Sequence, residues 1–299
     1  MRRLVVLGAV IVVGGVCVLA ASSQQGDGAK TIAVEKLKDN LYVLTTSSPA
    51  NRATFSGGNV AVFITDAGAV IVDTKLAGWG QALLDGIKKA TTKPVTTIIN
   101  THTHGDHTGN NELFGATVDS VVQENTKTNM AKMDAFKGDK AKFLPKRTYK
   151  DHLTIGSGKD RVELHYFGPG HTNGDTFVVF PALRVLHAGD MFPWKDAPFY
   201  DRSNGGTGVS FPQTLSKVLA LKDFDTVIPG HSPMMTRSDL QEYQKFTADL
   251  LASVRASVKA GKSLEDATAS AMSVPAKYKG YQSERLKAGV QAIYEELKK

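Results

Sequence analysis

Short apolar runs separated by polar turns dominate the first two thirds of the chain. Runs rich in Val, Ile, Leu and Phe that are bounded by Gly, Pro, Asn or Asp are typical of β-strands. The first half contains such runs at residues 32–37, 41–44, 59–64, 69–73, 96–100 and 116–124. The second half contains them at residues 162–167, 177–180, 184–188 and 226–228. Several of these runs are almost continuously apolar, which predicts strands that are covered on both faces.

Apolar residues at helical spacing follow each group of strands. Residues 78–90, 125–136 and 211–221 are predicted to be helices, and the sequence after Ser238 mixes polar and apolar residues at helical spacing up to the last residue. Two β-rich halves that are each followed by helices predict a layered α+β sandwich with the helices outside. No range indicates a separate domain with its own core.

The first residues have the pattern of an export signal. Two arginines precede an apolar run at residues 4–20, and small residues followed by polar ones offer a cleavage site. We therefore predict a signal peptide at residues 1–22 and a periplasmic or secreted domain at residues 23–299, whose helical C-terminal segment begins at about residue 239. An uncleaved anchor is the alternative, although the run is slightly short for a bilayer span and contains three glycines.

Composition changes this picture in two respects. Apolar residues make up 41% of the 299 residues and charged residues 22%, which are ordinary values for a globular protein. The formal charge of +7 comes from scattered lysines and arginines without interleaved aromatic residues, so we predict a small-molecule substrate and no nucleic-acid partner. The oligomeric state is left open. The only cysteine, Cys17, lies in the leader, so any metal site must consist of nitrogen and oxygen ligands.

Three imidazoles and a carboxylate lie in the loop that follows the run at residues 96–100. The loop reads Thr-His-Thr-His-Gly-Asp-His, and neutral imidazole and carboxylate are suitable ligands for zinc, iron and manganese. In an extended segment His102 and His104 point the same way, and a turn after them directs Asp106 and His107 elsewhere. One loop can therefore supply ligands to two neighbouring ions. The alternative is a surface loop that is merely rich in histidine.

Three further apolar runs end in residues that can bind a metal. His171 and His231 each follow a Pro-Gly turn, and Asp190 follows the run at residues 184–188. A single histidine at a strand end is more often structural, but three such ends accompany the His-rich loop here. His152, His165 and His187 have no comparable neighbours in the sequence, and we predict that they are surface or core residues.

With these residues the chain resembles the metallo-β-lactamase-fold hydrolases. The motif His-x-His-x-Asp-His of that family is present in the loop, and all seven ligand positions occur in the family's order between about residues 31 and 231. The resemblance implies a four-layer αββα sandwich, with a helical C-terminal extension in this chain. It places the metals at one edge, between the two sheets.

The resemblance also implies how the ligands are shared. His102, His104 and His171 would hold one ion, Asp106, His107 and His231 the other, and Asp190 would bridge both. Two zinc ions per chain are expected, with iron or manganese as alternatives. By the same resemblance Asp73 would brace the ligand loop, although it can also be a plain turn-capping residue.

The metals suggest hydrolysis of a small ester, thioester, lactone or lactam. Two cations that share a water lower its pKa and polarise the scissile group, and the catalytic residue Asp106 would orient the resulting metal-bridging hydroxide. The best-known zinc β-lactamases carry Cys or Ser at the position of Asp190, and this stretch most resembles an exported β-lactamase-like branch, with some features of glyoxalase II. The alternatives are a true β-lactamase, an oxidoreductase like the mono-iron persulfide dioxygenases, and a metal-bearing binding protein with little catalysis.

Four aromatic residues after Asp190 are candidates for an apolar wall of the substrate site. They are Phe192, Trp194, Phe199 and Tyr200. The alternative is that these side chains pack a long loop.

Overall fold

Apolar side chains between two β-sheets form the centre of the fold. The computed structural model describes residues 30–47 and 50–299, and residues 31–299 form one compact unit. The first sheet has its strands in chain order: β1 (Val34–Lys38), β2 (Leu41–Leu44), β3 (Val60–Ile64), β4 (Ala69–Val72), β5 (Val95–Ile99), β6 (Asp119–Gln123) and β7 (Arg147–Tyr149). The second sheet has the order β13 (Met235–Thr236), β12 (Thr226–Pro229), β11 (Val185–Gly189), β10 (Phe177–Phe180), β9 (Val162–His165) and β8 (His152–Ile155).

Successive residues of the central strands face different cores. In β3, Ala61 and Phe63 point between the sheets, whereas Val60 and Val62 point to the helix on the outer face. The alternation follows from the two-residue period of a strand, and the same pattern recurs in β10. Because both faces are covered, the strands are almost continuously apolar, as the sequence predicted.

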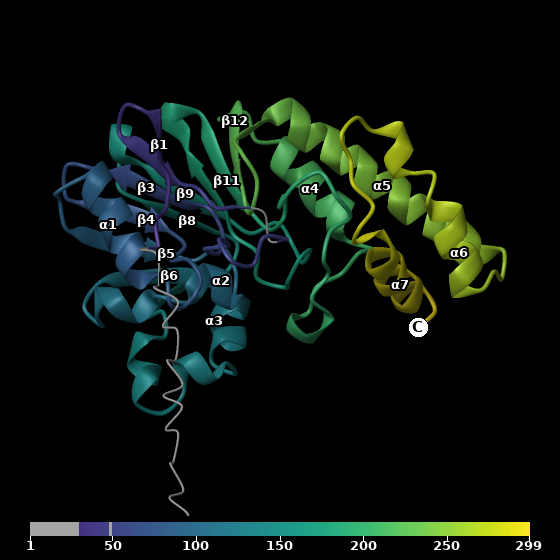
Figure 1. The fold of residues 1–299 in the computed structure, drawn as a ribbon, viewed down its shortest axis with the longest axis horizontal. Coiled ribbons are helices and arrows are strands. Elements are labelled where there is room, and N and C mark those ends of the chain that lie inside the picture. The colour runs from purple at the N-terminus through teal and green to yellow at the C-terminus, as the bar shows by residue number, and fades with distance from the viewer. Residues whose placement is uncertain (1–29, 48–49) are drawn as a thin grey trace, which may run out of the picture. The chain divides into compact units, whose positions relative to one another are not determined.

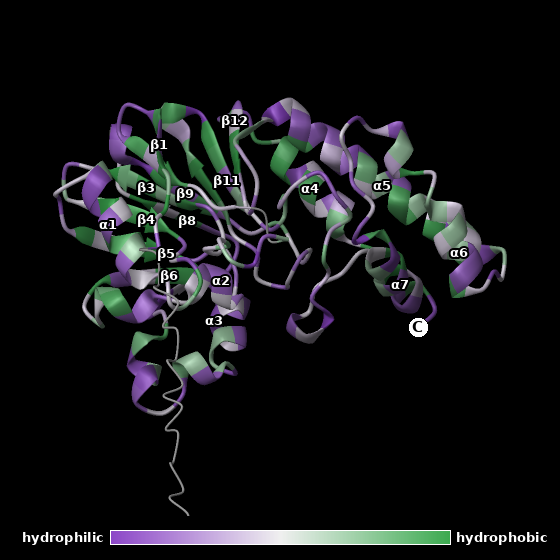
Figure 2. Cartoon of the chain, in the orientation of Figure 1, coloured by the Kyte–Doolittle hydropathy of each residue, from purple (hydrophilic) through white to green (hydrophobic). Residues whose placement is uncertain are grey.

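Helices cover the outer face of each sheet (Figure 1). The first sheet carries α1 (Gly80–Ala90) and α3 (Glu124–Met130), and the short α2 (Gly105–Thr108) lies in the loop after β5. The second sheet carries α4 (Phe211–Leu219) and α5 (Arg237–Lys259), against which α6 (Leu264–Ala271) and α7 (Leu286–Leu297) pack. Figure 2 shows the hydrophobic strands between helices that have both polar and apolar residues. The predicted αββα sandwich and the helical C-terminal region are confirmed.

Parallel strand pairs occur in both sheets and bring loop ends together. β4, β5 and β6 are mutually parallel in the first sheet, and β11 pairs in parallel with β12 in the second. The carboxyl ends of parallel strands lie at one edge of a sheet, so the loops that leave them are neighbours. Direct hydrogen bonds join these edges across the two sheets, from Asn59 N to Gly230 O (2.7 Å) and from Thr176 N to Thr101 O (2.7 Å).

Several predicted boundaries need correction. The strand expected at residues 116–124 covers only Asp119–Gln123, and the helix expected at 125–136 ends at Met130 in short 3-10 turns. Strands β7 and β8 were missed, because they lie at sheet edges and their half-exposed sequences lack a long apolar run. The C-terminal helical segment is three separate helices, and Gly261, with a φ of 69°, follows the end of α5.

The predicted signal peptide at residues 1–22 lies outside the described residues. Among the helices of the described part, none has the length and apolar character needed to span a bilayer.

The buried residue Lys75 makes folding stability depend on pH. Its side chain is fully buried, and Nζ donates hydrogen bonds to the carbonyls of Leu44 (2.9 Å) and Thr45 (3.1 Å). Burial lowers the pKa of Lys75 to about 7, against the opposing effect of the Asp73 carboxylate.

We therefore predict that Lys75 favours the folded state more as the pH rises. Between about pH 7 and the ordinary lysine pKa of 10.5 only the unfolded chain holds the proton, so stability increases with a slope of up to about 1.4 kcal/mol per pH unit. The measurement is urea unfolding of metal-depleted protein at several pH values, in wild type and Lys75→Met. Over this window the free energy of unfolding of the wild type should rise relative to that of Lys75→Met. A difference between the two free energies that stays constant with pH would contradict the assignment.

Candidate metal centre

The ligand loop starts where β5 ends and is held in place by buried polar contacts. Asn100 donates its side-chain amide to the carbonyl of His107 (3.1 Å), which also accepts a hydrogen bond from Thr74 N (2.7 Å). His104 caps the short helix α2 with an extended backbone, so the direction of the chain changes between His104 and His107. This change of direction is the turn that the sequence predicted at Gly105.

Three imidazole nitrogens converge on one point. His104 Nδ1 lies 3.2 Å from His102 Nε2 and 3.0 Å from His171 Nε2. His171 comes from the loop between β9 and β10, so the second sheet completes a set that the first sheet begins. Separations near 3 Å between three nitrogens fit ligands that share one ion at about 2.1 Å.

A second group of donors lies beside the first. His107 Nε2 is 3.3 Å from His231 Nε2, and Asp106 Oδ2 is 3.7 Å from the former nitrogen and 3.3 Å from the latter. His231 lies two residues after the end of β12, in the Pro-Gly turn that the sequence analysis singled out. Each of the two groups has its donor atoms within 4.8 Å of one another.

Asp190 lies between the two groups. Its Oδ1 is 3.4 Å from His107 Nε2 and 3.2 Å from His231 Nε2, whereas its Oδ2 is 3.7 Å from His171 Nε2. The residue follows β11, the parallel neighbour of β12, and the carboxylate is almost fully buried. One oxygen therefore faces each group, and the structure brings all seven sequence-predicted ligand residues together.

Outer contacts orient four of the five histidines. Asp73 Oδ2 lies 2.7 Å from His107 Nδ1, and Thr101 Oγ1 lies 3.0 Å from His102 Nδ1. The carbonyl of Phe199 lies 2.7 Å from His171 Nδ1, and Asp201 Oδ2 lies 2.7 Å from His104 Nε2. Such partners fix the ring orientation and leave the other nitrogen free to bind a metal.

The Asp73 carboxylate also holds the backbone of the ligand loop. Besides contacting His107, it accepts hydrogen bonds from Thr101 N and Thr101 Oγ1, both at 2.8 Å. Its own backbone is left-handed, with a φ of 67°, and its side chain is fully buried. The geometry therefore matches the bracing role rather than that of an exposed turn cap.

The electrostatics of the cluster depend on its buried carboxylates. Burial lowers the pKa of His102, and that of His171 to about 4, with neighbouring imidazoles acting in the same direction. Burial also opposes a charge on His107, but Asp106, Asp73 and Asp190 outweigh it and hold the pKa of His107 well above its usual range. The carboxylates of Asp106, Asp73 and Asp190 therefore favour a positive charge beside them, either a proton on His107 or a metal ion.

Close backbone approach to the ligands requires glycine at two positions. A Cβ atom at Gly58 would lie 2.2 Å from the His107 ring, and one at Gly230 would lie 2.0 Å from Asp190 Oδ1. Both distances are far below van der Waals contact. Any side chain at either position would therefore displace a donor of the cluster.

Two residues that support the cluster were missed by the sequence reasoning. Asp201 holds His104 from 97 positions away, and its local signal is only the Asp-x-Ser-Asn-Gly turn in which Ser203 and Asn204 donate to its carboxylate. Asn59 donates its side-chain amide to the carbonyls of Pro229 (2.9 Å) and Ser232 (2.8 Å), on either side of His231. The turn marks Asp201 as a capping residue, but nothing in the sequence indicates the partners of Asp201 or Asn59, because each contact depends on tertiary pairing.

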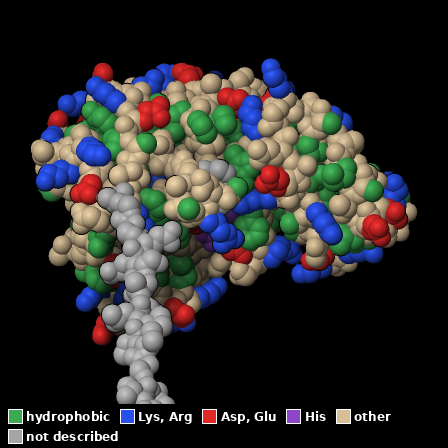
Figure 3. All heavy atoms as spheres, viewed as in Figure 1, with side chains coloured by type: hydrophobic (Ala, Val, Ile, Leu, Met, Phe, Trp, Pro, Cys, Tyr) green, Lys and Arg blue, Asp and Glu red, His purple; other side chains and the backbone are tan. Residues whose placement is uncertain are grey.

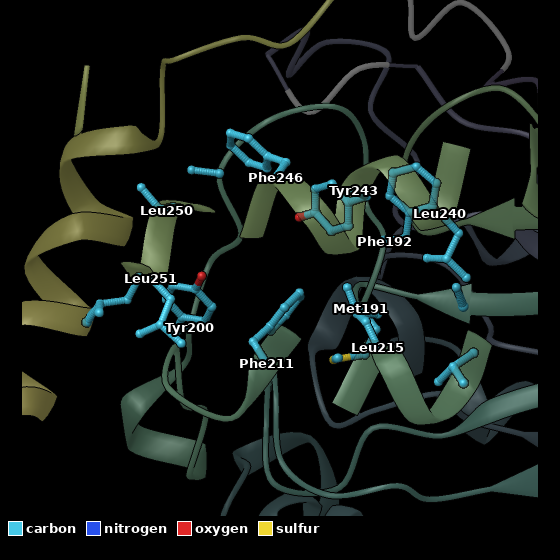
Figure 4. Close-up of a cluster of buried hydrophobic side chains, with 14 of the residues drawn as sticks. Met191, Phe192, Tyr200, Phe211, Leu215, Leu240, Tyr243, Phe246, Leu250 and Leu251 are labelled. Carbon is cyan, nitrogen blue, oxygen red and sulfur yellow. The ribbon is translucent and has the colours of Figure 1, made fainter. Parts of the chain in front are cut away.

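The predicted aromatic wall is wrong for two of its four residues. Phe192 is fully buried and stacks on Tyr243 of α5 at 4.6 Å, and Tyr200 is 3% exposed and packs against Phe211 of α4 (Figure 4). Both side chains belong to the core between the second sheet and its helices, where Met191 and Ala197 of the same loop are also buried.

The other two aromatic residues lie beside the ligands. Phe199 is 47% exposed, and its ring centroid is 6.2 Å from that of His104 and 5.9 Å from that of His171. The Trp194 ring lies 5.9 Å from that of His231 and carries the Arg285 guanidinium 4.2 Å above it. Trp194, His231 and Arg285 line a cavity of about 500 Å³. Figure 3 shows a small area of His surface beside Lys and Arg side chains.

The histidines outside the cluster differ from one another. His187 is fully buried, and its Nε2 lies 3.1 Å from the carbonyl of Asn59, which confirms a structural role. His152 and His165 lie on neighbouring strands with their rings 4.6 Å apart.

Comparison with known proteins agrees with this geometry. A family model described as the metallo-beta-lactamase superfamily matches residues 53–231, more than half of the chain. The chain belongs to the metallo-β-lactamase superfamily. The prediction of a metal-dependent hydrolase is thereby confirmed at the level of the superfamily, and this membership together with the His and Asp cluster indicates a divalent metal.

Two relatives of this chain are named as metallo-beta-lactamases. The "Metallo-beta-lactamase type 2" of Elizabethkingia meningoseptica is 31% identical over 177 residues, which cover 58% of this chain and 67% of the relative. The "Metallo-beta-lactamase IND-1" of Chryseobacterium indologenes is 26% identical over 201 residues, or 65% and 80% of the two chains. The crystal structure of DIM-1 metallo-beta-lactamase superposes with a TM-score of 0.60 over 73% of this chain and 98% of that one, at 21% identity, and shows the shared fold.

We predict that Asp73→Asn weakens metal binding without unfolding the protein. Asparagine tolerates the left-handed backbone but presents at best one acceptor, so His107 and Thr101 lose part of their support. Metal affinity measured by competition with a chelator should fall by about 10- to 100-fold. Asp85→Asn, an exposed change on α1, is the matched control, and equal affinities for the two variants would show that Asp73 does not support the ligands.

Proposed function

We propose that the protein is an exported dinuclear metal-dependent hydrolase of a small ester, thioester, lactone or lactam. The observation that carries the proposal is the arrangement of two donor groups with the two Asp190 oxygens facing one group each. A site for one ion would need only one of the two groups of donors, so the presence of the second group favours two ions. Export rests on the sequence of residues 1–22 alone.

The residues fit a pair of divalent cations. Asp190 Oδ1 is buried and has no hydrogen-bond partner among the described residues, which is costly for an atom that does not serve a ligand or a water. The donor set of five imidazoles and two carboxylates suits zinc, with iron or manganese as alternatives. We assign His102, His104 and His171 to one ion, Asp106, His107 and His231 to the other, and Asp190 to both.

The residues of the chain would divide the work of hydrolysis. When bound, two such ions supply an activated water and an electrophile for the scissile group. Asp106, whose side chain is 23% exposed, has its Oδ2 at the opening of the second group and can orient the attacking water and accept its proton. Asp73 and Asp201 keep the ligand rings in place, so the donors need no rearrangement during the reaction.

The surroundings indicate a substrate with an apolar part. Phe199 offers an exposed ring beside His104 and His171, and Trp194 offers another beside His231. Arg285 lies over Trp194 at the cavity wall, where a guanidinium favours an anionic group on the substrate. We therefore propose that these three side chains contact the substrate.

A true β-lactamase is the second candidate. It is favoured by the similarity to two relatives named as metallo-β-lactamases. A lactam that bears a carboxylate would also suit the Arg285 side of the cavity. The oxidoreductase alternative is disfavoured, because the second donor group is complete.

The first test is metal content per chain in wild type and Asp190→Ala. We expect about two ions in the wild type and fewer in the variant, because the carboxylate that faces both donor groups is lost. Elemental analysis of the protein as it is secreted from its own leader, without added metal, measures this. A single iron that the substitution leaves unchanged would rule out the dinuclear hydrolase.

We predict that Phe199→Ala raises KM with little change in metal content. The ring is half-exposed and is not a ligand, so the main cost of its removal is lost contact with the substrate, about 1 kcal/mol or fivefold in KM. The measurement is steady-state hydrolysis of a panel of esters, thioesters, lactones and lactams with and without a carboxylate. Met272→Ala removes an equally exposed apolar side chain from the end of α6 and is the control. An unchanged KM for every substrate would exclude Phe199 from the binding site.

A further inference from the structure

The hairpin of β8 and β9, at the edge of the second sheet, carries a second group of side chains that could hold a metal ion. Val162 and Leu164 of β9 point into the core between the sheets. Because side chains alternate along a strand, Glu163 and His165 point to the opposite, outer face. His152 is the direct partner of His165 in the antiparallel register, so it shares that outer face.

Antiparallel pairing brings the donors of this group close together. The rings of His152 and His165 lie 4.6 Å apart, and His165 Nε2 is 3.3 Å from Glu163 Oε2. One donor atom from each of the three residues lies within 4.8 Å of the others. None of the three belongs to the seven residues of the metal centre described above.

The side chains around these donors hold two of the three in place. Arg161 Nε lies 3.3 Å from the other Glu163 oxygen, which leaves Oε2 directed at His165. Phe167 stacks on the His165 ring at 5.4 Å with an interplanar angle of 6°, which fixes the plane of that imidazole. His152 is exposed, so its ring can adjust to an ion without disturbing the core.

The opening beside the group admits an ion and water. His152, His165 and Phe167 line a surface cavity of about 480 Å³, together with Lys217. The Lys217 ammonium donates to the carbonyl of Phe167 (2.9 Å) and is thereby engaged with the backbone. Three protein donors with an open side leave room for a water to complete the coordination.

We propose that His152, Glu163 and His165 form a separate, peripheral site for a transition-metal ion. Two imidazoles and one carboxylate suit zinc, copper or nickel, and three donors are too few for calcium, which takes six or more oxygens. An ion held there ties the edge strand β8 to β9 through side chains. It therefore stabilises the folded state by mass action without taking part in hydrolysis.

The proposal is tested by counting zinc ions on the full-length protein. Equilibrium dialysis against increasing free zinc, after the metal centre is saturated, should show one further ion per wild-type chain. His152→Ala and Glu163→Gln should each lose this ion over the same concentration range. Thr154→Ala is the matched control, because Thr154 is exposed on the same strand and face and lies opposite Glu163 in the register. It should retain the further ion.

A thermal readout separates metal binding from simple stacking of the two rings. Zinc added beyond saturation of the metal centre should raise the Tm of wild type and Thr154→Ala but not that of His152→Ala. If stacking alone explains the pair, His152→Ala lowers the Tm equally with and without added zinc, and this result overturns the proposal. Equal zinc counts for wild type and both donor variants overturn it as well.

Discussion

The buried carboxylate of Asp73 is the contact on which the rest of the metal centre depends. It lies directly after β4 and accepts hydrogen bonds from the first residue of the ligand loop, and it contacts His107 within that loop. A buried carboxylate is tolerated only when it is well paired, and here its partners are the loop itself. The Asp73 carboxylate therefore links the end of β4 directly to the placement of the loop that follows β5.

The two sheets contribute to the centre by the same structural device. In each sheet a pair of parallel strands ends at the site: β4 and β5 lead to Asp73 and the His-rich loop, and β11 and β12 lead to Asp190 and His231. Parallel neighbours deliver their following loops to one edge, which no antiparallel hairpin does. The cross-sheet hydrogen bonds of Asn59 and Thr176 then bring the two edges into contact, so the donors of both sheets share one buried volume.

The sequence predicted those parts of this arrangement that have a local cause. Short, almost continuously apolar runs between turn residues predicted the central strands, and a residue able to bind metal at the end of such a run predicted the candidate ligands His171, Asp190 and His231. Edge strands β7 and β8 were missed because their exposed faces dilute the apolar pattern. Asp201, Asn59 and the His152–His165 pair were missed for another reason, since each acts on a partner that only the tertiary pairing supplies. Phe192 was misplaced because an aromatic residue near a ligand in sequence can point to either side of its loop.

The C-terminal helices bear on the site although the family match ends at residue 231. Phe192, two residues after Asp190, stacks on Tyr243 of α5, and the loop that follows packs through Tyr200 against α4 and α7. The backbone of that same loop accepts the hydrogen bond of His171 at Phe199 and carries the Asp201 carboxylate that holds His104. Residue Arg285, just before α7, covers Trp194 at the cavity. The residues of the family match thus supply the candidate donors, whereas the helices of this chain pack against the loop that orients two of them. The surroundings of the donors therefore depend on the segment after residue 190 together with its helical support, and membership of the superfamily does not by itself fix the substrate.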